Sequence, residues 1–431
     1  MIKMTFSNYK LNKKNIKFLN PIMKNRFTTI FLFICYLAYS CANDKNQNEK
    51  GKEQEKNKSK SDTAIEKKDT LSLKKANSIC INDSLNELAM LIAGINPGKD
   101  AKILNSIFSG KTFLEHSKDF SKKWEKFDTS RIKILKDFRE KEISKVVSPS
   151  KTLLYPFSGP DILYAYTFFP EAEKYVMMGL EPVGTRVIYD EESQKNDSLS
   201  RYFGKIKHSL HAILNFSFFR TASMSSDLKN NDVDGTQHLL LLFLARTGNK
   251  ICEINPVYID STGNLKKAAG FPQLKKANYR NKGIEIVFST EAGDKKSLTY
   301  FSVNLSNEDF SKNLGMQKYI SSLGEVNSYF KGASYLMHLG SFSKFRKMVL
   351  NQSNFIIQDD SGIPIRYLDE EAKWDYTCYG SYSSPIKMFA HFYQKEMDTL
   401  YKINKAKPLG FGIGYKFKNN SSNFIIAKKQ K

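Results

Sequence analysis

The stretch "KTLLYPFSGPDILYAYTFFPEAEKYVMMGLEPVG", Lys151 to Gly184, decides the fold class. Its first part, "KTLLYPF", is a short apolar run typical of a strand, and "SGPDILYAYTFFPEA" has the length and polar start of a capped helix. A second strand-like run, "EKYVMMGLEPVG", follows it. Two strands joined by a helix-length crossover predict a parallel βαβ unit.

Strands and helices continue to alternate after this unit. The segments "NKICEINPVYID", "NKGIEIVFST" and "KSLTYFSVNL" are typical of strands. Helical periodicity predicts helices in "KYISSLGEVNSYFKGASYLMHL", "FSKFRKMVLNQSNF" and "SPIKMFAHFYQKEMDTLYKI". Before the unit, residues 80–147 carry apolar residues at three- and four-residue steps, which predicts a small helical subdomain. We therefore expect an α/β domain with a mixed sheet at 148–431, preceded by helices.

The net charge of +23 on 431 residues raises the question of a nucleic-acid partner. Residues 1–40 carry seven basic and no acidic side chains, so part of the excess lies in a short leader. The basic residues comprise 57 Lys and only 10 Arg, whereas readers of phosphates and base edges rely on Arg. Since no nucleic-acid-binding motif is present, we expect no nucleic-acid partner.

The leader has the parts of a secretory signal. Lys24 and Arg26 supply a positive region, and an apolar run of thirteen residues from Phe27 to Tyr39 follows. That run is short for a membrane-spanning helix, which needs about 20 apolar residues. We expect a signal peptide at 1–40, with translation starting at Met1 or Met23.

Ser40 and Cys41 close this leader, and the segment resembles the lipobox of bacterial lipoprotein precursors. Ala38 stands where the lipobox usually has Leu, and Tyr39 where it has a small residue, so ordinary signal cleavage stays an alternative. The resemblance covers about twenty residues. It implies acylation of Cys41 and a protein lipid-anchored to the outer membrane of the cell envelope, periplasmic or surface-exposed.

A polar segment follows the cysteine. Residues 42–79 are rich in Lys, Asn, Gln and acidic residues and contain no aromatic side chain. Such a segment cannot bury enough apolar surface to offset its ordering entropy. We expect residues 41–79 to form a disordered, Lys-rich tether that begins at the lipidated Cys41, and the body beyond it to be soluble.

Three polar residues near the βαβ unit are candidates for chemistry. Ser158 and Asp161 have the spacing of a capping box after the first strand, and Glu181 follows the second. The carboxyl ends of neighbouring parallel strands meet at one edge, where ligands bind in open α/β sheets. Ser158, Asp161 and Glu181 could therefore form a catalytic cluster. A purely structural interpretation is that they cap a helix and end a strand.

Two later segments are candidates for ligand binding. "IIQDDSGIPIRY" places Gln358, Asp359 and Asp360 before a glycine, as a capped turn or as a polar loop at a cleft. "WDYTCYGSYSSP", beginning at Trp374, mixes aromatic residues with Gly and Ser. That composition suits a recognition loop, for example for carbohydrate stacking, and is also found at core edges.

Metal and cofactor motifs are incomplete. "NNDVDG" at 230–235 begins like a calcium loop, but Leu241 stands where a bidentate Glu is required. His208 and His211 share a helix face without a cysteine pair or an H-E-x-x-H motif. We expect no metal site and no cofactor. Cys252 and Cys378 are expected to be buried thiols, with a disulfide between them as the alternative.

Two classes of function remain. The first is a membrane-anchored envelope lipoprotein whose soluble α/β domain binds a small molecule, a glycan or a protein. The second is an envelope hydrolase or metal-assisted enzyme that uses Ser158, Asp161 and Glu181. An enzyme predicts that these residues and a basic partner converge on one cavity, whereas a binding module predicts an exposed aromatic groove near Trp374.

Overall fold

The computed structural model describes residues 82–184, 198–207, 235–276, 279–417 and 421–430. The chain divides into two units, Met1–Leu73 and Lys74–Lys431, and every described residue belongs to the second. The predicted signal peptide at 1–40, the lipidated Cys41 and the tether at 41–79 lie outside the described residues and stay predictions. The same holds for His208, His211 and residues 230–234 of the incomplete calcium loop.

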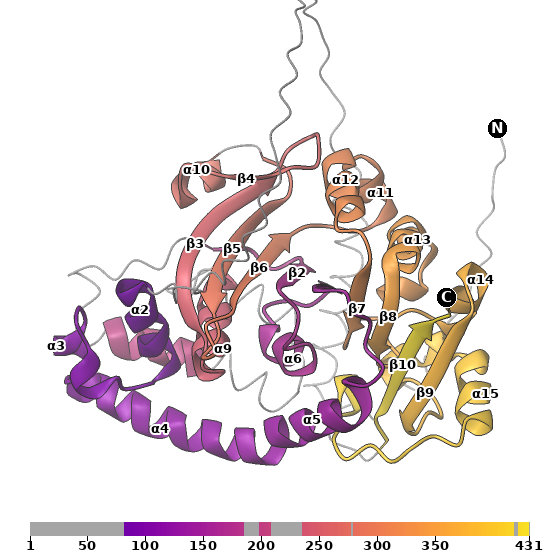
Figure 1. Cartoon of the computed structure of the whole chain (residues 1–431), viewed down its shortest axis with the longest axis horizontal. Helices are drawn as coiled ribbons and strands as arrows, with labels where there is room; N and C mark the ends of the chain where they lie inside the picture. The colour runs from indigo at the N-terminus through magenta and orange to yellow at the C-terminus, as the bar shows by residue number, and fades with distance from the viewer. Residues whose placement is uncertain (1–81, 185–197, 208–234, 277–278, 418–420, 431) are drawn as a thin grey trace, which may run out of the picture. The chain divides into compact units, whose positions relative to one another are not determined.

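The described strands form one ten-stranded mixed sheet in the order β4-β3-β5-β6-β2-β1-β7-β8-β10-β9 (Figure 1). Five neighbouring strands in its centre are parallel: β6 (Lys295–Ser302), β2 (Lys174–Gly179), β1 (Thr152–Pro156), β7 (Val326–Phe330) and β8 (Ser353–Gln358). Antiparallel pairings join the flanking strands β5 (Lys282–Ser289), β3 (Lys250–Ile259), β4 (Leu265–Lys267), β10 (Asn423–Lys429) and β9 (Trp374–Gly380). The predicted α/β class and mixed sheet are confirmed.

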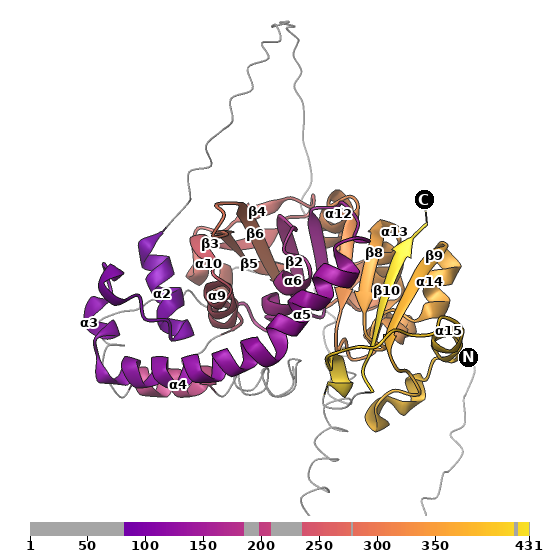
Figure 2. The same ribbon diagram turned by 60° about the horizontal axis from the view of Figure 1, so that its bottom comes forward.

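Helices pack on both faces of the sheet (Figure 2). One face is covered by α2 (Asp83–Ala93), α4 (Lys111–Phe127), α5 (Lys133–Phe138), α6 (Ile162–Phe168) and α9 (Gln237–Arg246). The other is covered by α11 (Asn307–Ser311), α12 (Leu314–Ser322), α13 (Ser343–Gln352), α14 (Ile365–Glu371) and α15 (Lys395–Ile403). Two short helices, α3 (Asn105–Phe108) and α10 (Phe271–Lys276), pack against α4 and β3. A helical N-terminal part is therefore present, as predicted, and it shares a core with the sheet.

Strand β1 contributes side chains to the hydrophobic cores on both faces of the sheet. Leu153 and Tyr155 point into the core beneath α6 and α9, and Leu154 points into the core beneath α12 and α13. Successive side chains of a strand alternate between faces, and a central parallel strand is buried on both. This explains why "TLLYP" is an unbroken apolar run, and why β1, α6 and β2 form the predicted parallel βαβ unit.

Five strands were not predicted from the sequence: β4, β7, β8, β9 and β10. The helix expected around residues 318–339 ends at Ser322, Gly324 follows with a φ of +67°, and residues 326–330 form β7. All five residues of β7 are buried, so no alternation of apolar and polar residues marks it as a strand. Strand β10 was also missed, although it lies between β8 and β9.

The cysteine alternatives are resolved for two residues. Cys252 on β3 and Cys378 on β9 are both buried, and no disulfide joins them. Strands β3 and β9 lie near opposite edges of the sheet, so the alternative of a disulfide between these residues is wrong. Both are buried thiols, as expected.

Candidate ligand-binding site

The order in which successive strands are added to the sheet reverses between the parallel neighbours β1 and β7. From β1 the chain crosses to β2 on one side, and from β7 it crosses to β8 on the other. In open α/β sheets, the loops that leave such neighbours in opposite directions open a crevice at the carboxyl ends of the strands. We therefore expect a ligand site among the residues that follow β1, β2 and β7.

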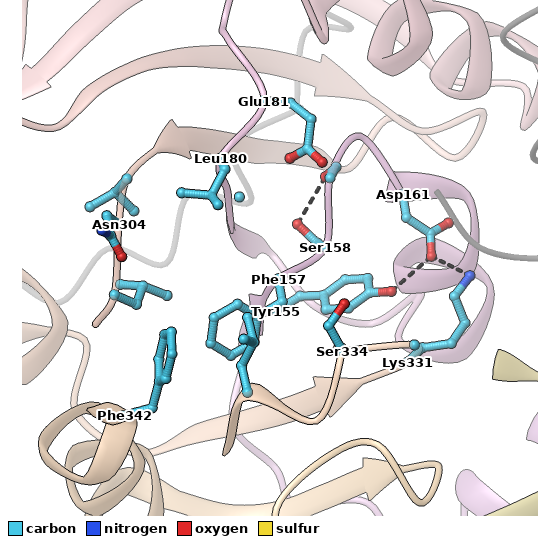
Figure 3. Close-up of a pocket in the computed structure, with 16 residues that line it drawn as sticks. Tyr155, Phe157, Ser158, Asp161, Leu180, Glu181, Asn304, Lys331, Ser334 and Phe342 are labelled. Atoms are coloured by element: carbon cyan, nitrogen blue, oxygen red, sulfur yellow. Dashed lines mark hydrogen bonds and ion pairs between the residues drawn. The ribbon is translucent and has the colours of Figure 1, made fainter. Parts of the chain in front are cut away.

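A cavity of about 70 Å³ lies at this position (Figure 3). It is lined by the loops that follow four parallel strands, β1, β2, β6 and β7. The wall is mostly apolar and includes Phe157, Leu180, Val303, Leu305 and Phe342. Small-molecule sites have this character, with a few placed polar groups among apolar walls.

A buried ion pair forms the polar end of the cavity. The ammonium Nζ of Lys331 lies 2.5 Å from Oδ2 of Asp161, and the two side chains are only 2% and 1% exposed. The Tyr155 hydroxyl donates a hydrogen bond of 2.8 Å to the same oxygen (Figure 3). Burial raises the pKa of Asp161, while Lys331 and the Tyr155 hydroxyl act in the opposite direction. The opposite charges of Asp161 and Lys331 therefore balance each other within the protein.

Helix α6 holds Asp161 in place. Asp161 is the N-cap of α6, and its Oδ1 accepts a hydrogen bond from the backbone N–H of Tyr164 at 3.4 Å. The predicted capping box is wrong in detail, because the cap is Asp161 and not Ser158. The ring of Tyr164 lies 3.4 Å from Nζ of Lys331, so a cation–π contact also fixes the ammonium group.

Glu181 and Ser158 line the same cavity but have different partners. The Tyr300 hydroxyl lies 3.1 Å from Oε2 of Glu181 and 3.1 Å from its backbone oxygen. The Ser158 hydroxyl donates to the backbone oxygens of Gly159 at 2.9 Å and Met178 at 3.3 Å. Among the described residues, no base accepts a hydrogen bond from the Ser158 hydroxyl that would activate it as a nucleophile. Asp161 and Glu181 share the cavity, but no hydrogen bond joins them.

The backbone around the cavity is strained. Phe157, Ser334 and Tyr335 have φ values of +57°, +52° and +56°, in the left-handed region that non-glycine residues rarely adopt. Phe157 and Ser334 line the cavity, and Tyr335 follows directly. Strain of this kind costs about 1–3 kcal/mol per residue and collects at functional sites.

Residues of the segment after β8 support the loop after β7. Asp359 accepts hydrogen bonds from the backbone N–H groups of Gly332 at 2.9 Å and Ser361 at 3.0 Å. Burial, and then the neighbouring Asp360, raise the pKa of Asp359 to about 6. A Cβ on Gly414 would come within 1.8 Å of the Asp359 carboxylate, so only glycine fits there. This segment positions the loop and does not line the cavity.

None of the four residues predicted to bind a ligand, Gln358, Asp359, Asp360 and Trp374, lines this cavity. Gln358 exchanges two hydrogen bonds with the backbone of Ile363, at 2.8 and 2.7 Å, which is the capped turn considered from the sequence. Trp374 lies in β9 with its side chain 6% exposed and packs in the core beneath α14 and α15. The expectation of an exposed aromatic loop at Trp374 is therefore wrong.

Sequence reasoning missed Lys331 and Tyr155. Lys331 follows directly after β7, and this strand was assigned to a helix, so the strand-end rule was not applied there. Tyr155 lies inside β1, where an apolar run is typical of core residues. A signal for β7 was present, because Gly324 and Gly332 bound a short run with Val, Tyr and Phe.

Metal and membrane features were also sought. Within the described ranges, no group of three or more His, Cys, Asp or Glu residues could hold a metal ion. None of the helices described here is long and apolar enough to cross a membrane.

In comparisons with protein-family models, curated proteins and solved structures, nothing matches this chain.

Proposed function

We propose that this chain is an exported lipoprotein of the bacterial cell envelope whose α/β domain binds a small molecule in the strand-end cavity. The observation that carries the proposal is the convergence of Asp161, Lys331 and Glu181 on one mostly apolar cavity, at the position where the strand order of the sheet reverses. Apolar walls with a few fixed polar groups suit a small molecule better than a protein surface. The strained backbone at the cavity mouth supports the same proposal.

Filling the cavity tests the binding proposal. Full-length chain isolated from its own membranes should carry a small molecule that native mass spectrometry detects. The variant Val303→Phe enlarges a lining side chain and should lose it. Leu114→Phe, at an exposed position on α4, is the control and should retain it. A ligand that stays bound to Val303→Phe would contradict this location.

The membrane anchor is tested separately. The apolar leader, Ser40 and Cys41 support acylation, and the polar segment 42–79 would span roughly 35 Å as a flexible chain. A fatty-acid analogue fed to the cells should label the protein, and Cys41→Ala should abolish the label. Label that persists in Cys41→Ala would refute the anchor.

A second candidate is an envelope hydrolase, which is favoured because Ser158, Asp161, Glu181 and the basic Lys331 line one cavity, as an enzyme was expected to show. Lys331, Asp161 and Tyr155 form a buried cluster of groups that can exchange protons, and burial raises the pKa of Asp161. The catalytic role is thereby proposed for Asp161 with Lys331, while the bonds of Ser158 to backbone oxygens argue against a serine nucleophile. Turnover of chromogenic esters or phosphoesters that disappears in Lys331→Met would support this candidate, and turnover equal in both proteins would refute it.

A further inference from the structure

Three of the described residues that line the cavity are charged: Asp161, Glu181 and Lys331. Lys331 is fully engaged by Asp161, with which it forms the buried pair at 2.5 Å. Glu181 is 2% exposed, and within the described part of the chain its carboxylate meets the Tyr300 hydroxyl and no cationic group. Among the described residues that line the cavity, Glu181 is therefore the acidic side chain without a cationic partner.

Another buried glutamate in the same protein shows what a structural carboxylate looks like. Glu87 is 3% exposed, and its two oxygens accept hydrogen bonds from the backbone N–H groups of Lys102, Ile103 and Leu104. Several donors compensate that carboxylate for the loss of water. Glu181 has one neutral donor instead. Buried charges are normally paired, so a cavity-facing carboxylate without a counter-charge is a candidate site for a cation.

Two aromatic rings in the wall of the cavity suit an organic cation. The rings of Phe157 and Phe342 lie 5.8 Å apart at an interplanar angle of 77° and both line the cavity. Aromatic faces attract ammonium groups through their quadrupole, and they leave the aliphatic part of a ligand in an apolar environment. The volume of about 70 Å³ limits the enclosed part of the ligand to a small head group.

We propose that the cavity binds the ammonium group of a small organic cation, with the Glu181 carboxylate as its counter-charge. This inference rests on the proposed small-molecule function and names the class of ligand. Phe157 and Phe342 form the wall around the ammonium group. Leu180, which is 53% exposed beside the cavity, is in place to contact the part of the ligand that reaches solvent. No covalent step is involved.

Calorimetric titration of the full-length chain tests the charge directly. The probes are ethanolamine and choline, each compared with the neutral molecule in which carbon replaces the charged nitrogen, 1-propanol and 3,3-dimethyl-1-butanol. At least one cation should bind at least about tenfold more tightly than its neutral counterpart. If neither cation binds better than its counterpart, the proposal is wrong. This comparison uses the unaltered protein and so does not depend on the folding of any variant.

The variant Glu181→Gln isolates the carboxylate. Its amide oxygen can still accept from Tyr300, and only the charge is removed. Binding of the cation should weaken at least about tenfold, and binding of the neutral counterpart should be unchanged. Without ligand, the variant should unfold at the same or a higher denaturant concentration, because an uncompensated buried charge has been removed. Undiminished cation binding by Glu181→Gln would overturn the assignment.

Glu142 provides a matched control. Its carboxylate also accepts from a tyrosine hydroxyl, Tyr379 at 2.7 Å, but it is paired with Lys407 at 2.8 Å and lies outside the cavity lining. Glu142→Gln should leave cation binding unchanged. If a molecule co-purifies with the chain and is lost in Val303→Phe while no ammonium compound binds, this inference fails and the proposed function stands. A cavity that takes up Mg²⁺ in preference to both ammonium probes would also overturn the inference.

Discussion

Replacing Lys331 by Met should destabilise the domain strongly at neutral pH. The substitution leaves Asp161 buried, with its side chain 1% exposed and its counter-charge gone. Removing one partner of a buried ion pair typically costs about 3–5 kcal/mol. With an unfolding entropy of roughly 2.1 cal/mol/K per residue over about 360 residues, this corresponds to a fall in melting temperature of about 5 °C.

The loss of stability in Lys331→Met should be larger at neutral pH than at acid pH. Burial already raises the pKa of Asp161, and removing Lys331 raises it further because the ammonium group favours the carboxylate. A carboxyl group with a raised pKa in the folded state is least costly when protonated. The variant should therefore be closest to the parent at acid pH, and its loss of stability should grow as the pH rises through the pKa of the folded state.

Chemical denaturation of three variants, each compared with the parent, tests this prediction. Lys331→Met should lose the stated free energy of unfolding, and the double variant Lys331→Met with Asp161→Asn should recover most of it, since no lone charge stays buried. The control Lys402→Met breaks an exposed pair with Asp398 and should change little. The reasoning is refuted if Lys331→Met loses less than about 1 kcal/mol at pH 7, or if the double variant is no more stable than the single one.

Three further outcomes are expected. Tyr155→Phe removes the hydroxyl that donates to Asp161 and should lower the unfolding free energy by about 1.5–3 kcal/mol in urea denaturation. Glu87→Gln places an amide against backbone N–H donors and should cost about 1–3 kcal/mol in the same assay, the opposite sign to Glu181→Gln. The pKa of Asp359 is raised to about 6 in the folded protein. Its contribution to stability is therefore complete below pH 3.8 and is lost as the pH rises through 6. The difference in unfolding free energy between the parent and Asp359→Asn should change between these two pH values.

The fold could be predicted where one local pattern dominated. Residues 151–184 combine unbroken apolar runs with a polar helix start, and the structure forms the predicted parallel unit there. Residues 326–330 offered no such contrast. Every side chain of β7 is buried, and the flanking segments have helical periodicity, so the pattern favoured a helix that tertiary pairing with β1 and β8 overrides.

The candidate site could be predicted in part for the same reason. Asp161 and Glu181 follow strands that the sequence revealed, and both line the cavity. Lys331 follows the strand that the sequence concealed, and no short-range signal connects it to Asp161, 170 positions earlier. The sequence therefore presented two carboxylates as a possible pair, whereas the fold provides each with a different electrostatic environment.

This difference assigns distinct roles to the two carboxylates. The Asp161 carboxylate pairs with Lys331, accepts a hydrogen bond from the Tyr155 hydroxyl and caps α6. It therefore offers little electrostatic attraction to a ligand. Glu181 faces the same cavity with its charge uncompensated by any described group. Neutralising one carboxylate internally keeps the site from carrying two negative charges, which would be costly at close range in a poorly hydrated cavity. Lys331→Met should therefore weaken cation binding less than Glu181→Gln does, because Lys331 is paired with Asp161 and its loss removes no attraction for the ligand.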